Sequence, residues 1–157
     1  MEGRSGNVNR LSHLNARGEA NMVDVSQKPV LLREALARGE IRLQKQTVRL
    51  IESQRIAKGN VLGAARLAGI LAAKKTGELI PLCHPLPLTY CEVTLEIPKS
   101  QDRIIISATA KIAAQTGVEM EALTAVSIAA LTIYDMCKAV DKKMRIGPIK
   151  LVSKTKR

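Results

Sequence analysis

The segment GVEMEALTAVSIAALTIYDMCKAVDKKM, residues 117–144, predicts the central helix of the fold. At about 100° per residue, its apolar side chains recur along one stripe of an α-helix. The stripe consists of Leu123, Val126, Ala130, Ile133 and Cys137. The opposite face, with Thr124, Ile128 and Leu131, is also mostly apolar. A helix with two apolar faces is expected to be buried on nearly all sides.

Charged residues near the end of this helix are the first candidates for chemistry. Asp135 and Lys138 are spaced i, i+3, and an exposed pair with this spacing commonly stabilises a helix by about 0.2–0.5 kcal/mol. The face that leads to them is apolar, however, which places the pair at the rim of buried surface. A lysine at such a rim can be partly desolvated and can act as an acid or a base.

Two acidic residues, Glu119 and Glu121, stand where the helix is expected to begin. In extended chain their side chains share one side, whereas in a helix they point about 200° apart. If they share a closed site, repulsion between the like charges raises one pKa. The alternative is that both simply complement the positive end of the helix dipole.

The residues before this helix predict a β-hairpin. In CEVTLEI, residues 91–97, apolar and polar side chains alternate with the period of a half-buried strand. Residues 98–102 predict a turn, and RIIISATAKIA, residues 103–113, returns as the antiparallel partner.

Further elements are expected on both sides of the hairpin. KPVLLREALARGE predicts a short helix with Pro29 near its start and Gly39 as its stop, and EIRLQ is a candidate strand. Residues 47–57 and 61–80 have helical spacing, and residues 145–153 predict a final strand that contains Pro148. The two prolines in residues 82–88 predict a fixed loop. The pattern predicts an α+β fold, an antiparallel sheet with helices packed on one face.

Length and composition predict one domain. A chain of 157 residues can bury a real core, and without Phe or Trp that core must come from Leu, Ile, Val and Ala. Residues 1–10 lack the apolar segment of a secretory signal and are expected to form a flexible tail before a single domain at residues 11–157. The apolar run of the central helix ends at Asp135, short of the ~20 residues that span a bilayer. We therefore expect a cytoplasmic protein without membrane contact.

Charge, aromatic content and cysteine spacing limit which ligands and partners the protein is expected to bind. The net charge is +11, and between Lys138 and Arg157 every charged side chain is basic except Asp141, so polyanions are attracted. The chain has only two aromatic residues and lacks the stacking surfaces of single-strand and RNA binders. The odd cysteine count without short paired spacing predicts no metal site and no disulfide framework. No glycine-rich phosphate loop is present.

Several segments resemble the cyclic pyranopterin monophosphate synthase family, the molybdenum cofactor biosynthesis protein C. They are IPLCHPLPL, residues 80–88; TGVEMEALTAVSIAALTIYDMCKAV, residues 116–140; IGPIKLVSK, residues 146–154; and the preceding HLNARGEANMVDVS, residues 13–26. The resemblance covers about residues 11–154, and residues 116–140 are its most specific part.

This resemblance implies a lyase of molybdenum cofactor biosynthesis in a single catalytic domain. Members of the family convert 3',8-cyclo-7,8-dihydro-GTP, a GTP-derived substrate, into the pterin cyclic pyranopterin monophosphate and release pyrophosphate. They use no redox cofactor. The implied fold is ferredoxin-like, and the implied assembly is a hexamer, a trimer of dimers, with active sites at subunit interfaces. A helix that is apolar all round then contacts both its own sheet and a partner subunit.

Site residues follow by matching the motifs one position at a time. The resemblance places the family's catalytic residues at Asp135, Lys138, Lys58 and Lys154. It places the substrate-binding residues at Leu82, Cys83, His84, Glu119, Met120 and Glu121. Asp24 and Lys28 are expected to border the site. We expect the lysines and carboxylates to share the proton transfers and the cations to stabilise the displaced pyrophosphate. A glutamate is expected to accept hydrogen bonds from the guanine-like edge of the substrate.

The sequence departs from the family at three places. Asn21 stands where some relatives have histidine, Gln115 stands where a basic residue occurs, and the chain ends as SKTKR without a glycine-rich tail. Two other classes remain open. A duplex nucleic-acid binder leaves Glu119, Glu121 and Asp135 unexplained, and in a structural oligomer Asp135 and Lys138 are only an interface pair.

Overall fold

A five-stranded antiparallel sheet forms the framework of the protein in a computed structural model, which describes residues 13–157. The flexible tail expected at residues 1–10 lies outside the described residues. Along the chain the elements are β1 (Leu31–Arg42), α1 (Lys45–Glu52), α2 (Val61–Lys74), α3 (Thr76–Leu79), β2 (Tyr90–Glu96), β3 (Arg103–Ala114), α4 (Glu119–Cys137), β4 (Arg145–Ile146) and β5 (Lys150–Lys156). The expected α+β class is therefore confirmed.

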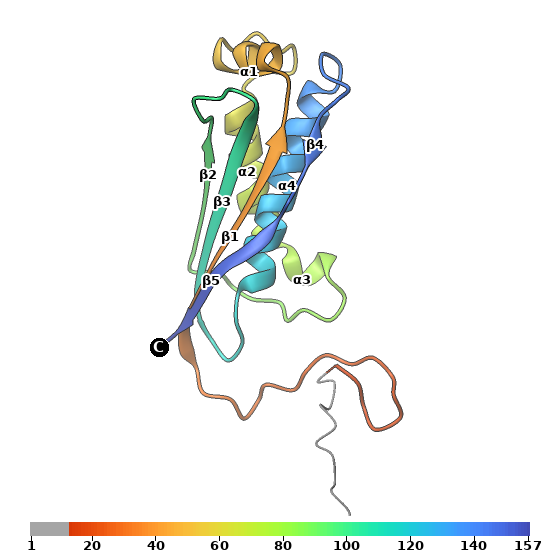
Figure 1. Cartoon of the computed structure of the whole chain (residues 1–157). Coiled ribbons are helices and arrows are strands. Elements are labelled where there is room, and N and C mark those ends of the chain that lie inside the picture. Colours follow the sequence, from red (N-terminus) through yellow and green to blue (C-terminus); the bar gives the residue numbers. More distant parts are fainter. Residues whose placement is uncertain (1–12) are drawn as a thin grey trace, which may run out of the picture.

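β1 is the central strand of the sheet. β3 pairs with its whole length on one side, and the short β4 and the longer β5 pair with its two halves on the other side. β2 forms the outer edge beyond β3. The long helices α2 and α4 lie side by side across one face of this sheet (Figure 1).

The helix predicted for residues 28–40 is wrong, because this segment is most of β1. Its leucine and alanine residues suit a helical period locally, but pairing with β3 and β5 on both sides overrides that preference. Alternate residues of the strand face the helices, and from the middle of the strand onward these are buried: Ala35, Ala37, Gly39 and Ile41. A Cβ at Gly39, which we expected to stop a helix, would lie 2.8 Å from Val126 on α4 and from Ile149. Gly39 is therefore a point of close approach between the sheet and α4.

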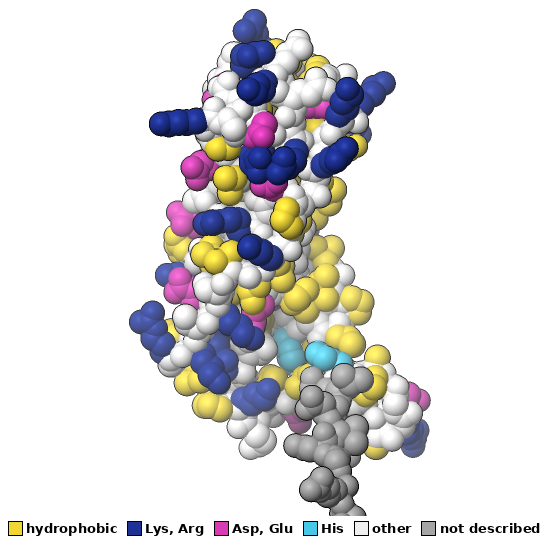
Figure 2. All heavy atoms as spheres, in the orientation of Figure 1, with side chains coloured by type: hydrophobic (Ala, Val, Ile, Leu, Met, Phe, Trp, Pro, Cys, Tyr) yellow, Lys and Arg dark blue, Asp and Glu magenta, His cyan; other side chains and the backbone are white. Residues whose placement is uncertain are grey.

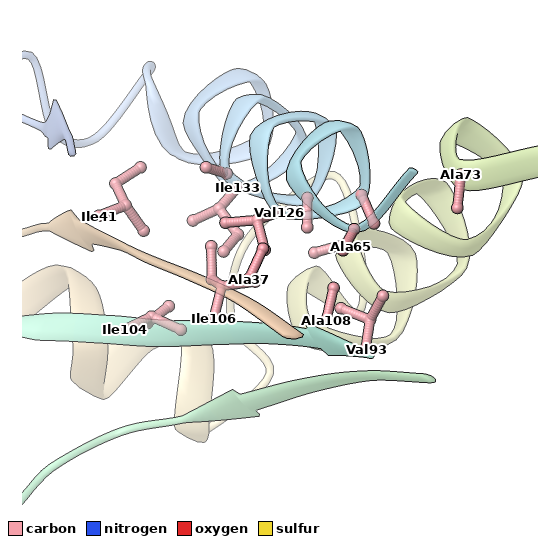
Figure 3. Close-up of a cluster of buried hydrophobic side chains, with 14 of the residues drawn as sticks. Ala37, Ile41, Ala65, Ala73, Val93, Ile104, Ile106, Ala108, Val126 and Ile133 are labelled. Carbon is pink, nitrogen blue, oxygen red and sulfur yellow. The ribbon is translucent and has the colours of Figure 1, made fainter. Parts of the chain in front are cut away.

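The core lies between the sheet and the two long helices. Figure 3 shows side chains from the strands pointing toward α4 and α2. On the sheet these include Ala37, Ile41, Val93, Ile104, Ile106 and Ala108, and they meet Val126 and Ile133 of α4 and Ala65 of α2. All are small or branched aliphatic residues, as the absence of Phe and Trp requires.

The remaining local predictions are largely confirmed. β2 and β3 form the expected hairpin, and residues 82–88 form a loop. The helix predicted for residues 61–80 ends at Lys74 and is followed by the single turn of α3. The predicted final strand is divided into β4 and β5, and Pro148 lies between them after a cis peptide bond.

Most of the predicted stripe of α4 is buried, and its opposite face is more open. Val126, Ala130, Ile133 and Cys137 are buried, whereas Leu131 is exposed over half of its surface. Within residues 13–157, α4 is the one helix whose length and apolar composition would allow it to cross a membrane. It packs against α2, β1 and β3 instead, as the core helix of a globular domain does.

Candidate functional site

All six predicted substrate-binding residues line one cavity of about 410 Å³ at the N-terminal end of α4. They come from two segments far apart in the sequence, the loop after α3 and the first turn of α4. They are Leu82, Cys83, His84, Glu119, Met120 and Glu121. The N-terminal segment completes the wall with His13, Val23, Val25 and Lys28. Figure 2 shows the histidine side chains where this segment meets the domain.

His84 attaches the N-terminal segment to the loop. Its Nε2 lies 2.7 Å from the backbone oxygen of Val23, which is hydrogen-bonding distance. Lys28 lines the cavity as expected, whereas the carboxylate of Asp24 accepts hydrogen bonds from the backbone and hydroxyl of Ser26. Asp24 therefore stabilises its own turn and is not among the residues that line the cavity.

Glu121 is an unusual carboxyl group because it is only 3% exposed. Burial, together with the charge of Glu119, raises its pKa to about 6. Among residues 13–157 no cationic side chain forms an ion pair with it. A carboxyl group with this pKa exchanges a proton readily near neutral pH, which is the property that general acid–base catalysis needs.

Glu119 has the opposite environment, although it lies in the same turn. Its Oε1 accepts from Nζ of Lys154 at 3.0 Å. Burial acts to raise its pKa, but a backbone hydrogen bond and the charge of Lys154 outweigh burial and lower the pKa. The pKa of one glutamate is therefore raised, but burial contributes more to this than the repulsion between like charges that we expected. A pair of carboxyl groups with different pKa values supports separate acid and base roles.

Cys83 lines the same cavity as a thiol. Burial and the nearby charge of Glu121 raise its pKa. The thiolate is the nucleophilic form of cysteine, so this environment does not favour a nucleophilic role. Cys83 contributes shape and a weakly polar surface.

A second cluster lies at the other end of α4. Nζ of Lys58 donates to the backbone oxygen of Asp135 at 2.9 Å and to its Oδ2 at 2.9 Å, and Nζ of Lys138 lies 2.7 Å from Oδ1. The lysines Lys138 and Lys58 together lower the pKa of Asp135 to about 2. We call Lys58, Asp135 and Lys138 the lysine–aspartate cluster.

The lysine–aspartate cluster is more exposed within the single chain than we expected. About half of each of the three side chains is accessible to solvent. The hydrogen bond from Lys138 to Asp135 raises the pKa of Lys138. Both lysines also lie at the C-terminal end of α4, where the helix dipole attracts cations. The cluster thus combines two ammonium groups with a single carboxylate at the C-terminal end of α4.

The cavity and the lysine–aspartate cluster do not meet within one chain. Glu119 and Asp135 lie about 24 Å apart along α4 at 1.5 Å per residue. Lys154 belongs with the cavity, because it pairs with Glu119. The ten predicted residues are therefore divided into seven at one end of the helix and three at the other.

Sequence reasoning missed Arg33, which lies near the cavity end. Its guanidinium donates to the backbone oxygens of Ala114 and Gln115 at 3.3 and 3.2 Å. With Glu119 and Lys154 it lines a second hollow of about 220 Å³, and with Lys28 it lines a third. We had assigned residues 28–40 to a helix. The alternation of buried and exposed side chains along a strand was therefore not used to place Arg33.

Metal ligands are not grouped anywhere in residues 13–157. No three His, Cys, Asp or Glu side chains there are arranged to hold an ion.

Together, the fold and the cavity define an α+β domain with a pair of carboxyl groups of divergent pKa in a partly basic site. The family model of the MoaC family matches residues 22–157, and the chain belongs to this family. The resemblance drawn from the motifs is thereby confirmed.

Curated relatives extend over nearly the whole chain. A protein of Parvibaculum lavamentivorans is 56% identical over 146 residues, which cover 93% of this chain and 91% of the relative. A protein of Chloroflexus aggregans is 57% identical over 150 residues, covering 96% and 91%. One of Clostridium perfringens is 55% identical over 146 residues, covering 93% and 92%. Each is named cyclic pyranopterin monophosphate synthase.

Proposed function

We propose that this protein is a cyclic pyranopterin monophosphate synthase, a lyase of molybdenum cofactor biosynthesis. It converts 3',8-cyclo-7,8-dihydro-GTP into cyclic pyranopterin monophosphate and releases pyrophosphate. The observation that carries the proposal is the cavity at the start of α4. Two motif segments separated in the sequence meet there, and they place the buried Glu121, with a pKa of about 6, beside the ionised Glu119.

The chemistry of the cavity suits a purine-derived substrate. Carboxylates accept hydrogen bonds from the N–H groups of a guanine-like edge, and Glu119 and Glu121 both line the cavity. Glu121 gives up or takes a proton as the ring is opened and rebuilt. The triphosphate needs cations. Lys28 lines the cavity, and Arg33 and Lys154 line a neighbouring hollow that shares Glu119 with it.

A complete site requires a second subunit. We propose a homo-oligomer, a hexamer built as a trimer of dimers, in which the lysine–aspartate cluster of one chain faces the cavity of another. The 24 Å between Glu119 and Asp135 supports this arrangement, because Lys58 and Lys138 of one chain cannot reach a substrate in its own cavity. We further propose that the enzyme acts in the cytoplasm on its small-molecule substrate, without a redox cofactor or metal and without binding a membrane or nucleic acid.

The test is turnover of the cyclised GTP derivative. The purified protein is supplied with substrate made fresh by the enzyme that cyclises GTP, and pyrophosphate and the fluorescent oxidised pterin are both measured. We expect both products from the wild type and neither from Lys138→Ala or Glu121→Ala. The matched control is Lys142→Ala, which removes an exposed lysine four positions beyond Lys138 and should retain activity.

If a folded, oligomeric wild type forms neither product, the proposed activity is wrong. Salt-dependent binding to duplex DNA would then distinguish the two remaining classes, because a nucleic-acid binder loses affinity steeply with salt and a structural oligomer shows no binding.

A further inference from the structure

Asp141 is a buried carboxylate that the proposed reaction does not use. It is the one acidic residue in the basic segment from Lys138 to Arg157, yet it is only 1% exposed. No cation forms an ion pair with it among the described residues, 13–157. A buried carboxylate without a cation requires dense hydrogen bonding to persist.

Neutral donors supply those hydrogen bonds. Oδ2 accepts from the backbone N–H of Gln44 at 2.8 Å and from the hydroxyl of Thr47 at 3.0 Å. Oδ1 accepts from the backbone N–H of Lys143 at 2.9 Å. Thr47 is itself 2% exposed, so the contact with α1 is closed to solvent.

The carboxylate binds the start of α1, which has no capping side chain of its own. α1 begins after Gln44, whose side chain makes no capping hydrogen bond, and the first turn of α1 contains no acidic residue. A helix start normally needs acceptors for its free N–H groups and benefits from a negative charge. Asp141 supplies an acceptor for one of these groups, the N–H of Gln44, and also accepts from the hydroxyl of Thr47 in the first turn. It therefore joins the start of α1 to the end of α4.

These two elements carry the lysine–aspartate cluster. Asp141 is attached rigidly to α4, because its backbone N–H donates to the oxygen of Cys137 at 3.0 Å. Lys58 lies in the connection from α1 to α2, where Ile56 is 6% exposed and packs in the core. The position of Lys58 relative to Asp135 therefore depends on how α1 is seated against the end of α4.

We propose that Asp141 is a positioning residue that holds Lys58 in register with Asp135 and Lys138. The proposal rests on the proposed function, since it assigns Asp141 a role in forming the site of that reaction. Asp141 acts through the seating of α1 and touches no substrate.

Asp141→Asn is the sharpest variant. Donors face both oxygens of the carboxylate, so either orientation of the amide directs its NH2 group at another donor. We expect kcat to fall about tenfold to a hundredfold, as small misplacements of catalytic groups do, while KM stays within about twofold. Thr47→Val removes one of the donors and should lower kcat in the same direction by a smaller factor.

The control separates positioning from a general loss of stability. Val93→Ala opens the buried core near α2, away from α1, and should lower the melting temperature without changing kcat at a temperature where all variants are folded. An unchanged kcat in Asp141→Asn overturns the proposal, as does an equal loss of kcat in Val93→Ala. If Asp141→Asn does not fold, Thr47→Val decides between the same outcomes.

Amide hydrogen exchange gives a readout that does not require activity. In Asp141→Asn we expect faster exchange both in residues 45–60 and in residues 134–141, with residues 82–86 and 119–121 unchanged. Faster exchange confined to residues 141–144 overturns the positioning role. If the wild type proves inactive, the proposed reaction fails, and this exchange pattern still decides whether Asp141 couples the two segments.

Discussion

Glu119 and Asp135 lie at opposite ends of α4, about 24 Å apart along the helix axis. Glu119 pairs with Lys154 in the wall of the cavity, whereas Asp135 is held between Lys58 and Lys138. The separation is several times the length of any side chain, so rotamer changes do not bring the two groups together. A site that uses both ends must be formed between chains.

The first prediction concerns mixed oligomers of two inactive variants. Lys138→Ala retains an intact cavity, and Glu121→Ala retains an intact lysine–aspartate cluster. In the proposed oligomer each site takes its two halves from different chains, so random mixing at equal amounts should restore about a quarter of wild-type activity. The measurement is pyrophosphate release after co-expression of the two variants with separate affinity tags.

Either variant mixed with wild-type protein serves as the reference for random assembly. If each site lies within one chain, the mixed oligomers of the two variants show no activity above that of the variants alone. That result would contradict the proposed shared site and leave the assignment of the cavity in place.

The second prediction concerns the pH dependence of stability. Burial raises the pKa of Glu121 from 4.5 to about 6, so the folded state holds this proton more tightly than the unfolded state. Its contribution to stability is fully present below pH 4.5 and is lost as the pH rises through about 6. At pH 8 Glu121→Gln should exceed the wild type in unfolding free energy by about 2 kcal/mol, with the advantage shrinking toward pH 4.5.

Glu119→Gln is the matched control for this measurement. Its pKa is lowered in the fold, so its stabilising contribution is present above pH 4.5 and is lost as the pH falls. The two variants should therefore shift the stability curve in opposite directions at pH 8. Denaturant unfolding at one fixed protein concentration measures both, and shifts of the same sign would contradict the environments described here.

The third prediction concerns the contact between α2 and α4. A Cβ at Gly69 would lie 2.9 Å from the backbone oxygen of Ala125 and 3.1 Å from a methyl group of Val93. Helix propensity alone favours Gly69→Ala by about 1 kcal/mol. We expect a net destabilisation of about 1–3 kcal/mol instead, because the helices must separate to admit the methyl group.

Ala64→Gly, the reverse change on the same helix, tests whether propensity is being read correctly. It should destabilise the protein by about 1 kcal/mol. Gly69→Ala and Ala64→Gly, although opposite in kind, should therefore both lower the free energy of unfolding. Thermal or denaturant unfolding of both variants provides the comparison. A gain in stability for Gly69→Ala would show that α2 and α4 pack less closely than described.

The fourth prediction assigns Arg33 to the binding of the phosphate groups. Arg33→Gln removes a cation from the hollow shared with Glu119 and Lys154, so KM for the triphosphate substrate should rise about tenfold, while kcat changes little. Competition by pyrophosphate should weaken in parallel. Steady-state kinetics with and without pyrophosphate measure both effects.

Arg38→Gln is the control on the same strand. Arg38 points to the opposite face of β1, where it donates to the hydroxyl of Ser107 at 3.1 Å. Its loss should leave KM unchanged. Equal effects of the two substitutions would indicate a general effect of net charge on substrate attraction, not a contact made by Arg33.

Local sequence patterns were sufficient to predict an element when its structure depends on its own residues or on the next segment of the chain. The β2–β3 hairpin follows from alternation in residues 91–97 and a short turn, and α4 follows from the period of its apolar residues. The same reasoning assigned residues 28–40 wrongly to a helix, since most of this segment is a strand stabilised by β3 and β5, whose sequences lie far along the chain. Because of that wrong assignment, Arg33 was not predicted to lie near the site.

The sequence by itself determined the family, the α+β class, the central helix and the residue types that carry the chemistry, because motifs and periodicity are properties of neighbouring residues. Only the tertiary structure decided which of those residues meet. It gathers the loop after α3, the N-terminal segment and the first turn of α4 around one cavity. It also places the lysine–aspartate cluster a helix length away, since a rigid α-helix separates groups at its ends by 1.5 Å per residue.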